Sequence, residues 1–206
     1  MECNFSPLHK ILGCLDHYCK VLVVAFVLLG LAAGCSLKGT DVTFVRQETD
    51  LGYINKVAIL PFSNNSNDDF AAMRIHGITA TQVLSMCIFD VIDPGIVDSA
   101  LREMAIDRNT PIDSPLLKRL GLRLGVQAFI HGSVDGIVVR AQGAFSYPEV
   151  SLTMRLLDSE TSMVLWQTSA HRNGYSLIDR LFDLNPQDGF GITLELVRDM
   201  LGTIPK

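Results

Sequence analysis

The segment Val21–Ala33 constrains this chain more than any other, because it reads VLVVAFVLLGLAA without a charge. It falls short of the ~20 residues that a membrane-spanning helix needs, and it matches the apolar region of a secretory signal peptide. Lys10 and Lys20 precede the run, and Cys35 follows it after a single glycine. We therefore predict that residues 1–34 are a signal peptide and that the exported protein starts at Cys35.

The stretch Leu31–Cys35 (LAAGC) resembles the lipobox read by lipoprotein signal peptidase, although Ala32 stands where Leu is commoner. Acyl chains such as palmitate contribute ~0.8 kcal/mol per buried methylene, so lipidated Cys35 is predicted to anchor the protein to one leaflet of a bilayer. In the sorting rule of enteric bacteria, Asp after the cysteine retains a lipoprotein in the inner membrane. Ser36 at that position predicts the outer membrane, facing the periplasm. The alternative is an uncleaved N-terminal anchor with an incidental cysteine.

The charge balance argues against nucleic acid as a partner. The 206 residues include 17 Lys and Arg against 22 Asp and Glu, which gives a formal net charge of −5. The charges of the leader cancel, so the exported part keeps this acidic balance, whereas a protein that grips phosphates needs an excess of Lys and Arg. The length suits one domain with a sizeable core.

Cysteine usage predicts a chain without an intramolecular disulfide. Cys3, Cys14 and Cys19 leave with the leader, so only Cys35 and Cys87 remain. With lipid on Cys35, Cys87 has no partner in the same chain. Between two apolar neighbours, Cys87 is predicted to be a small buried hydrophobe, with a lone reactive thiol as the alternative.

The exported part is predicted to consist of a tether, residues 35–55, and one domain, residues 56–206. The tether is polar, with a short extended piece around Val42–Val45. The predicted strands are Lys56–Phe62, Phe89–Ile92, Ala128–Val139, Val150–Leu157 and Met163–Ala170, and the predicted helices are 70–86, Ile96–Met104, Pro115–Gly125, Tyr175–Leu184 and Gly191–Leu201. This order predicts an α/β fold: a mixed sheet whose last three strands form an antiparallel meander, with helices packed on the sheet.

Three blocks resemble the CsgG/TolB-N-terminal-like superfamily of bacterial lipoproteins. They are Val57–Phe62 (VAILPF), Gly125–Val134 (GVQAFIHGSV) and Val150–Trp166 (VSLTMRLLDSETSMVLW), in the order of the family. The resemblance implies a fold like the CsgG periplasmic domain and the anticodon-binding domains. It also implies kinship with envelope lipoproteins such as the curli channel CsgG, the Pel exopolysaccharide protein PelC and the penicillin-binding-protein activator LpoB, of which several members assemble into rings.

The chain departs from this family pattern at three places. Ser162 occupies the hairpin position where the family usually has Gly, so the turn must hold a non-glycine residue at positive φ or change type. Gln127 replaces the family's Asp before the long strand. The residues Arg140–Glu149 are too few for the membrane-spanning hairpins of CsgG, so a curli-type pore is not expected.

No group of residues predicts catalysis, a cofactor or a metal. The exported histidines, His76, His131 and His171, lie far apart in sequence, and His131 is predicted to be a hydrogen-bonded structural residue. Asp68 and Asp69 precede a helix and are predicted to cap it rather than to bind a cation.

Two apolar features complete the prediction. Trp166, the only tryptophan, is expected in the core with a partner for its N–H. The segment Tyr175–Leu184 carries Leu177, Ile178, Leu181 and Phe182. It is predicted to face the core, with a self-association surface as the alternative.

The sequence thus predicts a non-enzymatic outer-membrane lipoprotein. Its periplasmic domain would be an assembly or scaffold component in envelope biogenesis or in polysaccharide or protein export, with envelope proteins as partners and a homo-oligomer as its form. One alternative is an LpoB-like activator of a peptidoglycan synthase, which must reach through the cell wall. The other is an envelope enzyme.

Overall fold

The structure is a computed structural model, and it describes residues 41–47, 50–106, 113–143, 145–175, 179, 181–182 and 185–205. Contacts divide the chain into Met1–Lys38 and Gly39–Lys206, and every described residue belongs to the second unit. The predicted signal peptide and Cys35 lie outside the described residues and remain predictions.

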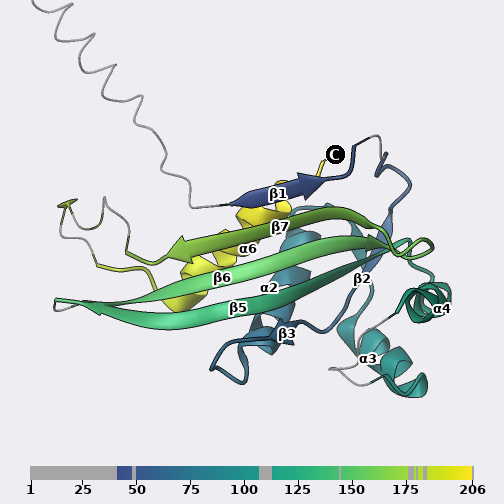
Figure 1. Cartoon of the computed structure of the whole chain (residues 1–206), viewed down its shortest axis with the longest axis horizontal. Coiled ribbons are helices and arrows are strands. Elements are labelled where there is room, and N and C mark those ends of the chain that lie inside the picture. Colours follow the sequence, from purple (N-terminus) through teal and green to yellow (C-terminus); the bar gives the residue numbers. More distant parts are fainter. Residues whose placement is uncertain are drawn as a thin grey trace, which may run out of the picture. The chain divides into compact units, whose positions relative to one another are not determined.

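The described strands form one seven-stranded mixed sheet in the order β1-β7-β6-β5-β2-β4, with β3 beside β5 (Figure 1). Their bounds are β1 Val42–Val45, β2 Lys56–Ile59, β3 Ser63–Asn64, β4 Asp90–Val91, β5 Ala128–Gln142, β6 Phe145–Asp158 and β7 Val164–Asn173. Strands β5, β6 and β7 are an antiparallel meander, whereas β2 runs parallel to both β4 and β5. The predicted α/β fold with a mixed sheet is confirmed.

Four helices of the described chain pack on this sheet: α2 Ala71–Ser85, α3 Pro94–Glu103, α4 Ser114–Leu124 and α6 Gly189–Leu201. Asp93, Asp113 and Asp188 cap the last three, because each carboxylate accepts a backbone N–H of the first turn. Gly125, at φ 65°, ends α4 in the left-handed region that favours glycine. The four predicted helices that correspond to these are confirmed to within about two residues.

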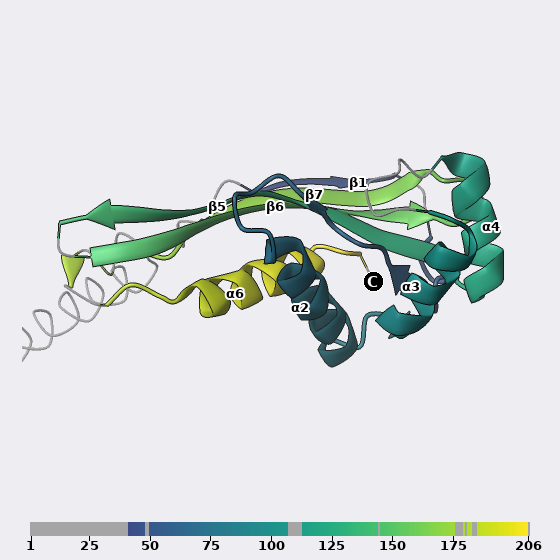
Figure 2. The same cartoon turned by 90° about the horizontal axis from the view of Figure 1, so that it is seen from below.

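The two faces of the sheet carry separate apolar clusters, because side chains alternate along each strand. Val57 and Ile59 of β2 pack with α2 and α6, whereas Ala58 and Leu60 pack with α3 and α4. Figure 2 shows α2 and α6 along one side of the strands, with α3 and α4 gathered at one end. Trp166 is buried in the first cluster and donates its Nε1–H to Thr203 Oγ1 at 2.9 Å, as predicted.

The folded unit starts earlier than predicted. Residues Val42–Val45, placed in the tether by the sequence, form β1 and pair with the outer edge of β7. Further along, Ile54 is buried in the core, and Tyr53 Oη donates to Asp158 Oδ2 at 2.6 Å. The domain therefore starts at β1 rather than at Lys56. The sequence does not reveal this, because β1 pairs with β7, over a hundred residues away in the sequence.

The β5–β6 hairpin is longer than predicted. Gly132 and Gly136 do not break β5, since a shift of register between Val134 and Gly136 lets the strand continue as a bulge. Most of the residues Arg140–Glu149, predicted to connect two strands, lie within them, because β5 extends to Gln142 and β6 starts at Phe145. Pairing continues to Gln142 opposite Phe145.

The departures from the family pattern have defined structural roles. Ser162 adopts φ 61°, which confirms a non-glycine residue at positive φ in the β6–β7 turn. Gln127 Oε1 accepts the N–H of Lys56 at 2.9 Å and so ties the start of β2 to the start of β5.

The residues between the predicted strand Lys56–Phe62 and the predicted helix 70–86 contain the short strand β3, which runs parallel to β5.

Candidate functional site

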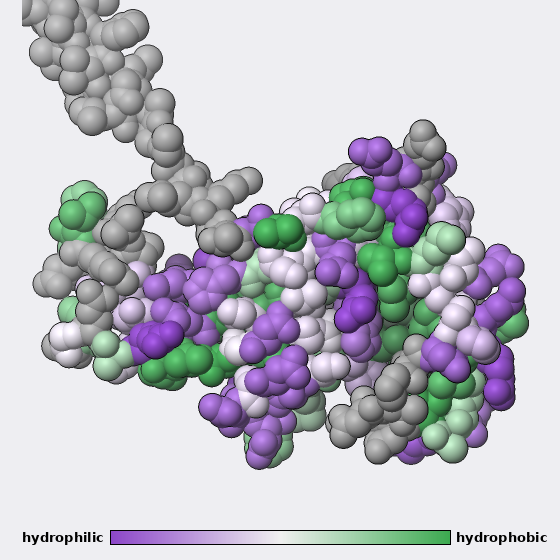
Figure 3. All heavy atoms as spheres, viewed as in Figure 1, coloured by the Kyte–Doolittle hydropathy of each residue, from purple (hydrophilic) through white to green (hydrophobic). Residues whose placement is uncertain are grey.

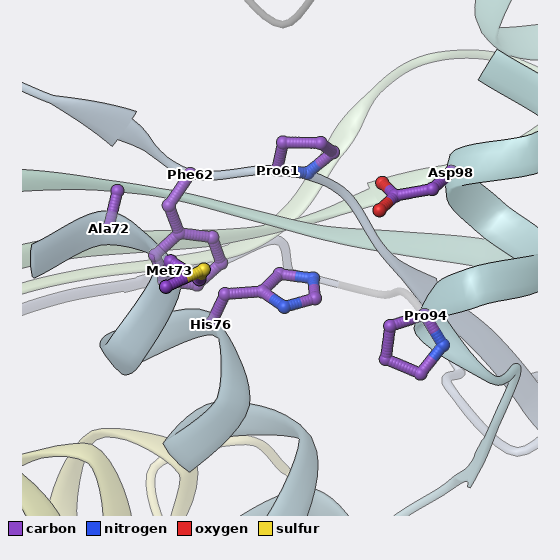
Figure 4. Close-up of a pocket in the computed structure, with 7 residues that line it drawn as sticks. All are labelled: Pro61, Phe62, Ala72, Met73, His76, Pro94 and Asp98. Carbon is purple, nitrogen blue, oxygen red and sulfur yellow. The ribbon is translucent and has the colours of Figure 1, made fainter. Parts of the chain in front are cut away.

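A pocket of about 220 Å³ opens beyond the carboxyl end of β2, between α2 and α3 (Figure 4). Its lining residues are Pro61, Phe62, Ala72, Met73, His76, Pro94 and Asp98. The topology creates this pocket. The chain leaves β2 toward α2 on one face of the sheet, and after β4 it continues into α3 on the other face. The two helices therefore start on opposite sides of the strand end.

The floor of the pocket is held by Phe62. Its ring lies against the backbone of Gly132 so closely that a Cβ at that glycine would stand 2.6 Å from Phe62 Cε2. Phe62 is buried, and its ring meets the His76 ring edge to face, with 6.0 Å between centroids and 89° between planes. Packing therefore explains the glycine at position 132, because any larger side chain there would clash with the Phe62 ring.

Two polar groups face the pocket from opposite walls. His76 Nε2 lies 3.2 Å from the Ile59 carbonyl oxygen, which can only accept, so Nε2 carries the hydrogen of this bond. In the neutral ring, Nδ1 is then an acceptor. Figure 4 shows the Asp98 carboxylate reaching in from α3. None of the described lining residues carries a hydroxyl, a thiol or an amine, so His76 and Asp98 are the polar side chains that this pocket offers.

Sequence reasoning noted His76 only as isolated and missed Phe62, Pro94 and Asp98. Two signals were available, since both Pro61 and Pro94 follow a short apolar strand and precede a helix. Without the strand order, however, nothing in the sequence shows that these two ends meet.

The other two histidines lie on the sheet, apart from the pocket. Burial, and secondarily the charge of Arg155, lowers the pKa of His131 to about 4. No described residue hydrogen-bonds to its ring, unlike the prediction, so it is a half-buried neutral side chain. His171 Nδ1 lies 2.9 Å from Ser151 Oγ. Within the described ranges, no group of three or more His, Cys, Asp or Glu residues could hold a metal ion.

The sheet face opposite α2 and α6 carries a polar network along β5, β6 and β7. Asp135 accepts hydrogen bonds of 2.6 Å from both Ser133 Oγ and Thr153 Oγ1, and Thr153 also contacts Ser169 Oγ at 2.9 Å. Arg155 Nε is buried there without a hydrogen-bond partner. Figure 3 looks onto this face and shows pale and purple residues across its middle.

The prediction that the acidic pair before α2 caps this helix is wrong, because the N-cap residue is Phe70 and no side chain makes a capping hydrogen bond there. Asp68 Oδ1 accepts the N–H of Phe70 at 3.1 Å, and the carboxylate forms an ion pair with Arg74. The hydrogen bonds from Arg74 and from the Phe70 N–H lower the pKa of Asp68. Asp68 thus holds the turn ahead of α2, whose own first turn carries no acidic residue.

Two predictions of burial are wrong. Cys87 is exposed, because it follows the end of α2 at φ 51° and turns away from the core. Leu181 and Phe182 are 79% and 72% exposed, so this part of the segment Tyr175–Leu184 does not face the core. The rest of that segment lies largely outside the described residues.

None of the described helices is long and apolar enough to cross a membrane. Cys35, the one residue that the sequence assigns to a site, cannot be placed among these features because it lies outside the described ranges.

No protein-family model matches the sequence, and no curated protein matches it. Solved structures do. PelC from Paraburkholderia phytofirmans, solved as a dodecamer in two crystal forms, of which one is a point variant, gives TM-scores of 0.56 and 0.55. Sequence identity is 18% and 17%, over 79% of this chain and 95% and 96% of PelC.

Lipoprotein GNA1162 from Neisseria meningitidis gives a TM-score of 0.51 at 19% identity, over 73% of this chain and 97% of its own. At such identities the likeness shows the fold alone, and that fold is shared along almost the whole of both relatives. The C-terminal domain of LpoB from Salmonella enterica reaches a TM-score of only 0.45, which is too low to carry an argument.

Proposed function

We propose that this chain is a lipid-anchored outer-membrane protein whose α/β domain faces the periplasm and serves as an assembly or scaffold element in envelope biogenesis or export. The fold shared with PelC and GNA1162 supports this proposal, as does the lipobox-like stretch that ends at Cys35. The wider kinship with CsgG remains a prediction from the sequence blocks.

The observation that carries the proposal is the pairing of β1 with β7. Because β1 belongs to the sheet, only the six residues Ser36–Asp41 separate Cys35 from the folded domain. An extended chain of this length reaches at most roughly 20 Å, against roughly 70 Å for the tether 35–55 that the sequence predicted. A domain with so short a connection to its lipid anchor acts close to the membrane surface.

This distance separates the proposal from the LpoB-like alternative. An activator that docks on a cell-wall synthase has to reach through the peptidoglycan, and the short connection leaves little chain for that. The pocket does not favour the enzyme alternative either, since its described lining residues include no serine, threonine, cysteine or lysine.

Lipidation is tested with the full precursor expressed in a Gram-negative host. The wild type is expected to yield a mature form that starts at Cys35, carries acyl groups by mass spectrometry and sediments with the outer membrane. Cys35→Ser should remain unprocessed and unacylated. Cys87→Ser is the matched control, because it removes the other cysteine and should mature like the wild type. A Cys35→Ser protein of unchanged mass and membrane attachment would rule the proposal out.

We also propose that the protein assembles into a homo-oligomer. The exposed Leu181 and Phe182 support it, since large apolar side chains at the surface mark contact sites when they cluster. Light scattering on the mature lipoprotein in detergent should show an oligomer, and Leu181→Ser with Phe182→Ser should shift it toward the monomer. Leu122→Ser on α4, 77% exposed, is the control. A wild type that stays strictly monomeric at high concentration would contradict assembly.

A further inference from the structure

A second pocket, of about 310 Å³, lies where α2 and α6 end. It is formed by residues at and after the ends of these helices and by the connection between β1 and β2. Its apolar lining includes Ile54, Met86, Ile88, Phe89, Leu201 and Ile204. None of the described lining residues carries a charge, so a charged group would lose its hydration there without gaining an ionic partner. The pocket therefore favours an apolar occupant.

The size and accessibility of this pocket suit one or two apolar side chains. A cavity of roughly 150 Å³ holds a benzene ring, so this pocket has room for a phenylalanine ring and an aliphatic side chain beside it. Cys87 and Pro205 line the pocket and are exposed. An apolar group of another molecule can therefore enter it from the surface.

Exposed apolar side chains of this size lie toward the other end of α6. The N–H of Gln187 donates to the Gly174 carbonyl oxygen at 2.8 Å, and the N–H of Gly174 donates to the Pro148 carbonyl oxygen at 2.8 Å. The connection between β7 and α6 therefore leaves and rejoins the domain beside the β5–β6 hairpin. Leu181 and Phe182 lie in this connection, and both side chains are largely exposed. Figure 2 shows the start of α6 toward the free end of this hairpin, whereas the pocket lies at the last turn of the helix.

Helix α6 separates the pocket from these two side chains. Its 13 residues span roughly 20 Å, and Leu181 and Phe182 fill no cavity of their own molecule because they are exposed. We propose that the pocket receives Leu181 and Phe182 of a second copy of this chain. An acyl chain in the pocket would leave both residues in water, whereas a second copy covers the pocket and the pair in one contact.

This contact joins two different surfaces, so each pair of copies leaves one pocket and one Leu-Phe pair unfilled. Contacts of this kind repeat head to tail and build a ring or a filament, whereas a two-fold contact stops at a dimer. The inference rests on the proposed homo-oligomer and names the contact that builds it.

Disulfide cross-linking in membranes that carry the mature lipoprotein tests this contact. With Cys35 acylated as proposed, Cys87 is the remaining thiol of the exported chain, and Phe182→Cys adds one to the inserted pair while Leu181 still fills the pocket. A disulfide needs two Cα atoms within about 7 Å of each other. Under mild oxidation, Phe182→Cys should therefore give a reducible ladder of dimers, trimers and larger species. Leu122→Cys, exposed on α4 to a similar degree, is the matched control and should give none.

Gly202→Leu tests the pocket itself. Gly202 lines it at φ −63°, an ordinary helical value, and an added Cβ would meet no atom closer than 3.4 Å. The larger side chain should fill the pocket and weaken association by about ten- to hundredfold, measured by light scattering over a dilution series in detergent. Gly77→Leu, in open space on α2, is the matched control and should assemble like the wild type.

The outcomes separate this contact from assembly itself. Adding Cys87→Ser to Phe182→Cys should abolish every cross-linked species. A wild-type oligomer in which Phe182→Cys forms no ladder, or forms dimers that persist after Cys87→Ser is added, would overturn the inference and leave the homo-oligomer standing. Assembly of Gly202→Leu like the wild type would overturn it as well, and if that variant does not fold, the cross-linking decides alone. A wild type that stays monomeric would instead contradict the proposed oligomer and this contact with it.

Discussion

The two faces of the β5–β7 meander contrast sharply although the same strands build both. On one face Leu152, Met154 and Leu156 of β6 are completely or almost completely buried under α6 and its neighbours. On the other face the alternate residues Ser151, Thr153 and Arg155 are only half-buried. No described helix covers that second face beyond the start of β5 (Figure 2). The stability of this sheet therefore comes mainly from the packing on one side.

The open face is nevertheless organised. Its hydroxyl groups and Asp135 satisfy one another through hydrogen bonds, while Arg155 and His131 are paired directly across β5 and β6. Burial of the His131 imidazole, and secondarily the charge of Arg155, lowers its pKa and keeps the ring neutral near pH 7. The open face therefore carries a group whose protonation costs folding energy.

The largest effect should come from the covered face. Leu152→Ala removes a buried side chain and leaves a cavity, so it should lower the free energy of unfolding by about 2–5 kcal/mol. Urea unfolding followed by the fluorescence of the single buried Trp166 measures this. Thr153→Ala, the next residue along the same strand, points to the open face and should cost about 1 kcal/mol or less. Equal losses from the two variants would refute the contrast between the faces.

The second effect is a pH dependence that arises from His131 on the open face. The pKa of His131 is about 4 in the folded protein, below its ordinary value of 6.5. Between these values the unfolded chain binds the extra proton, so the free energy of unfolding should fall as pH drops from 6.5 to 4, by up to about 3 kcal/mol.

His131→Gln should remove this part of the pH dependence, as measured by urea unfolding at a series of pH values. His171→Gln, an exposed histidine of the same face, is the control and should leave the slope unchanged. A slope that persists in His131→Gln would assign the effect to other groups, among them the carboxylate of Asp158. Burial raises the pKa of Asp158, but hydrogen bonds from Tyr53, Thr161 and the backbone outweigh it and lower the pKa.

The covered face could be predicted from sequence, because period-two alternation from Val150 to Leu156 states which side is buried. The contents of the open face could not. Whether Ser151 and Thr153 face water or a helix depends on where α3 and α4 pack, and that depends on strand order. The same limit explains why the sequence did not predict β1 or the pocket. Strand β1 forms only by pairing with β7, and Asp98 lines a pocket only because α2 lies across from it. Neither contact leaves a pattern in the neighbouring residues of the sequence.

The smallest predicted effect concerns the turn that fixes which residues lie on which face. A slip of one residue between β6 and β7 would exchange the two faces, so the β6–β7 turn holds the register as well as the chain direction. Ser162 sustains φ 61° in this turn without being glycine. Ser162→Gly should therefore raise the free energy of unfolding by about 0.5–1 kcal/mol, because glycine adopts this conformation without strain.

Gly125→Ala supplies the matched opposite case, since Gly125 has φ 65° and open space around a new Cβ. That variant should lose about 1 kcal/mol through backbone strain alone. The pH dependence assigned to His131 should be the same in both variants, because neither moves a residue from one face to the other. If Ser162→Gly instead flattened that pH dependence, the serine would be holding the register itself. One strained turn, rather than the packing on the covered face, would then determine which residues lie on the open face.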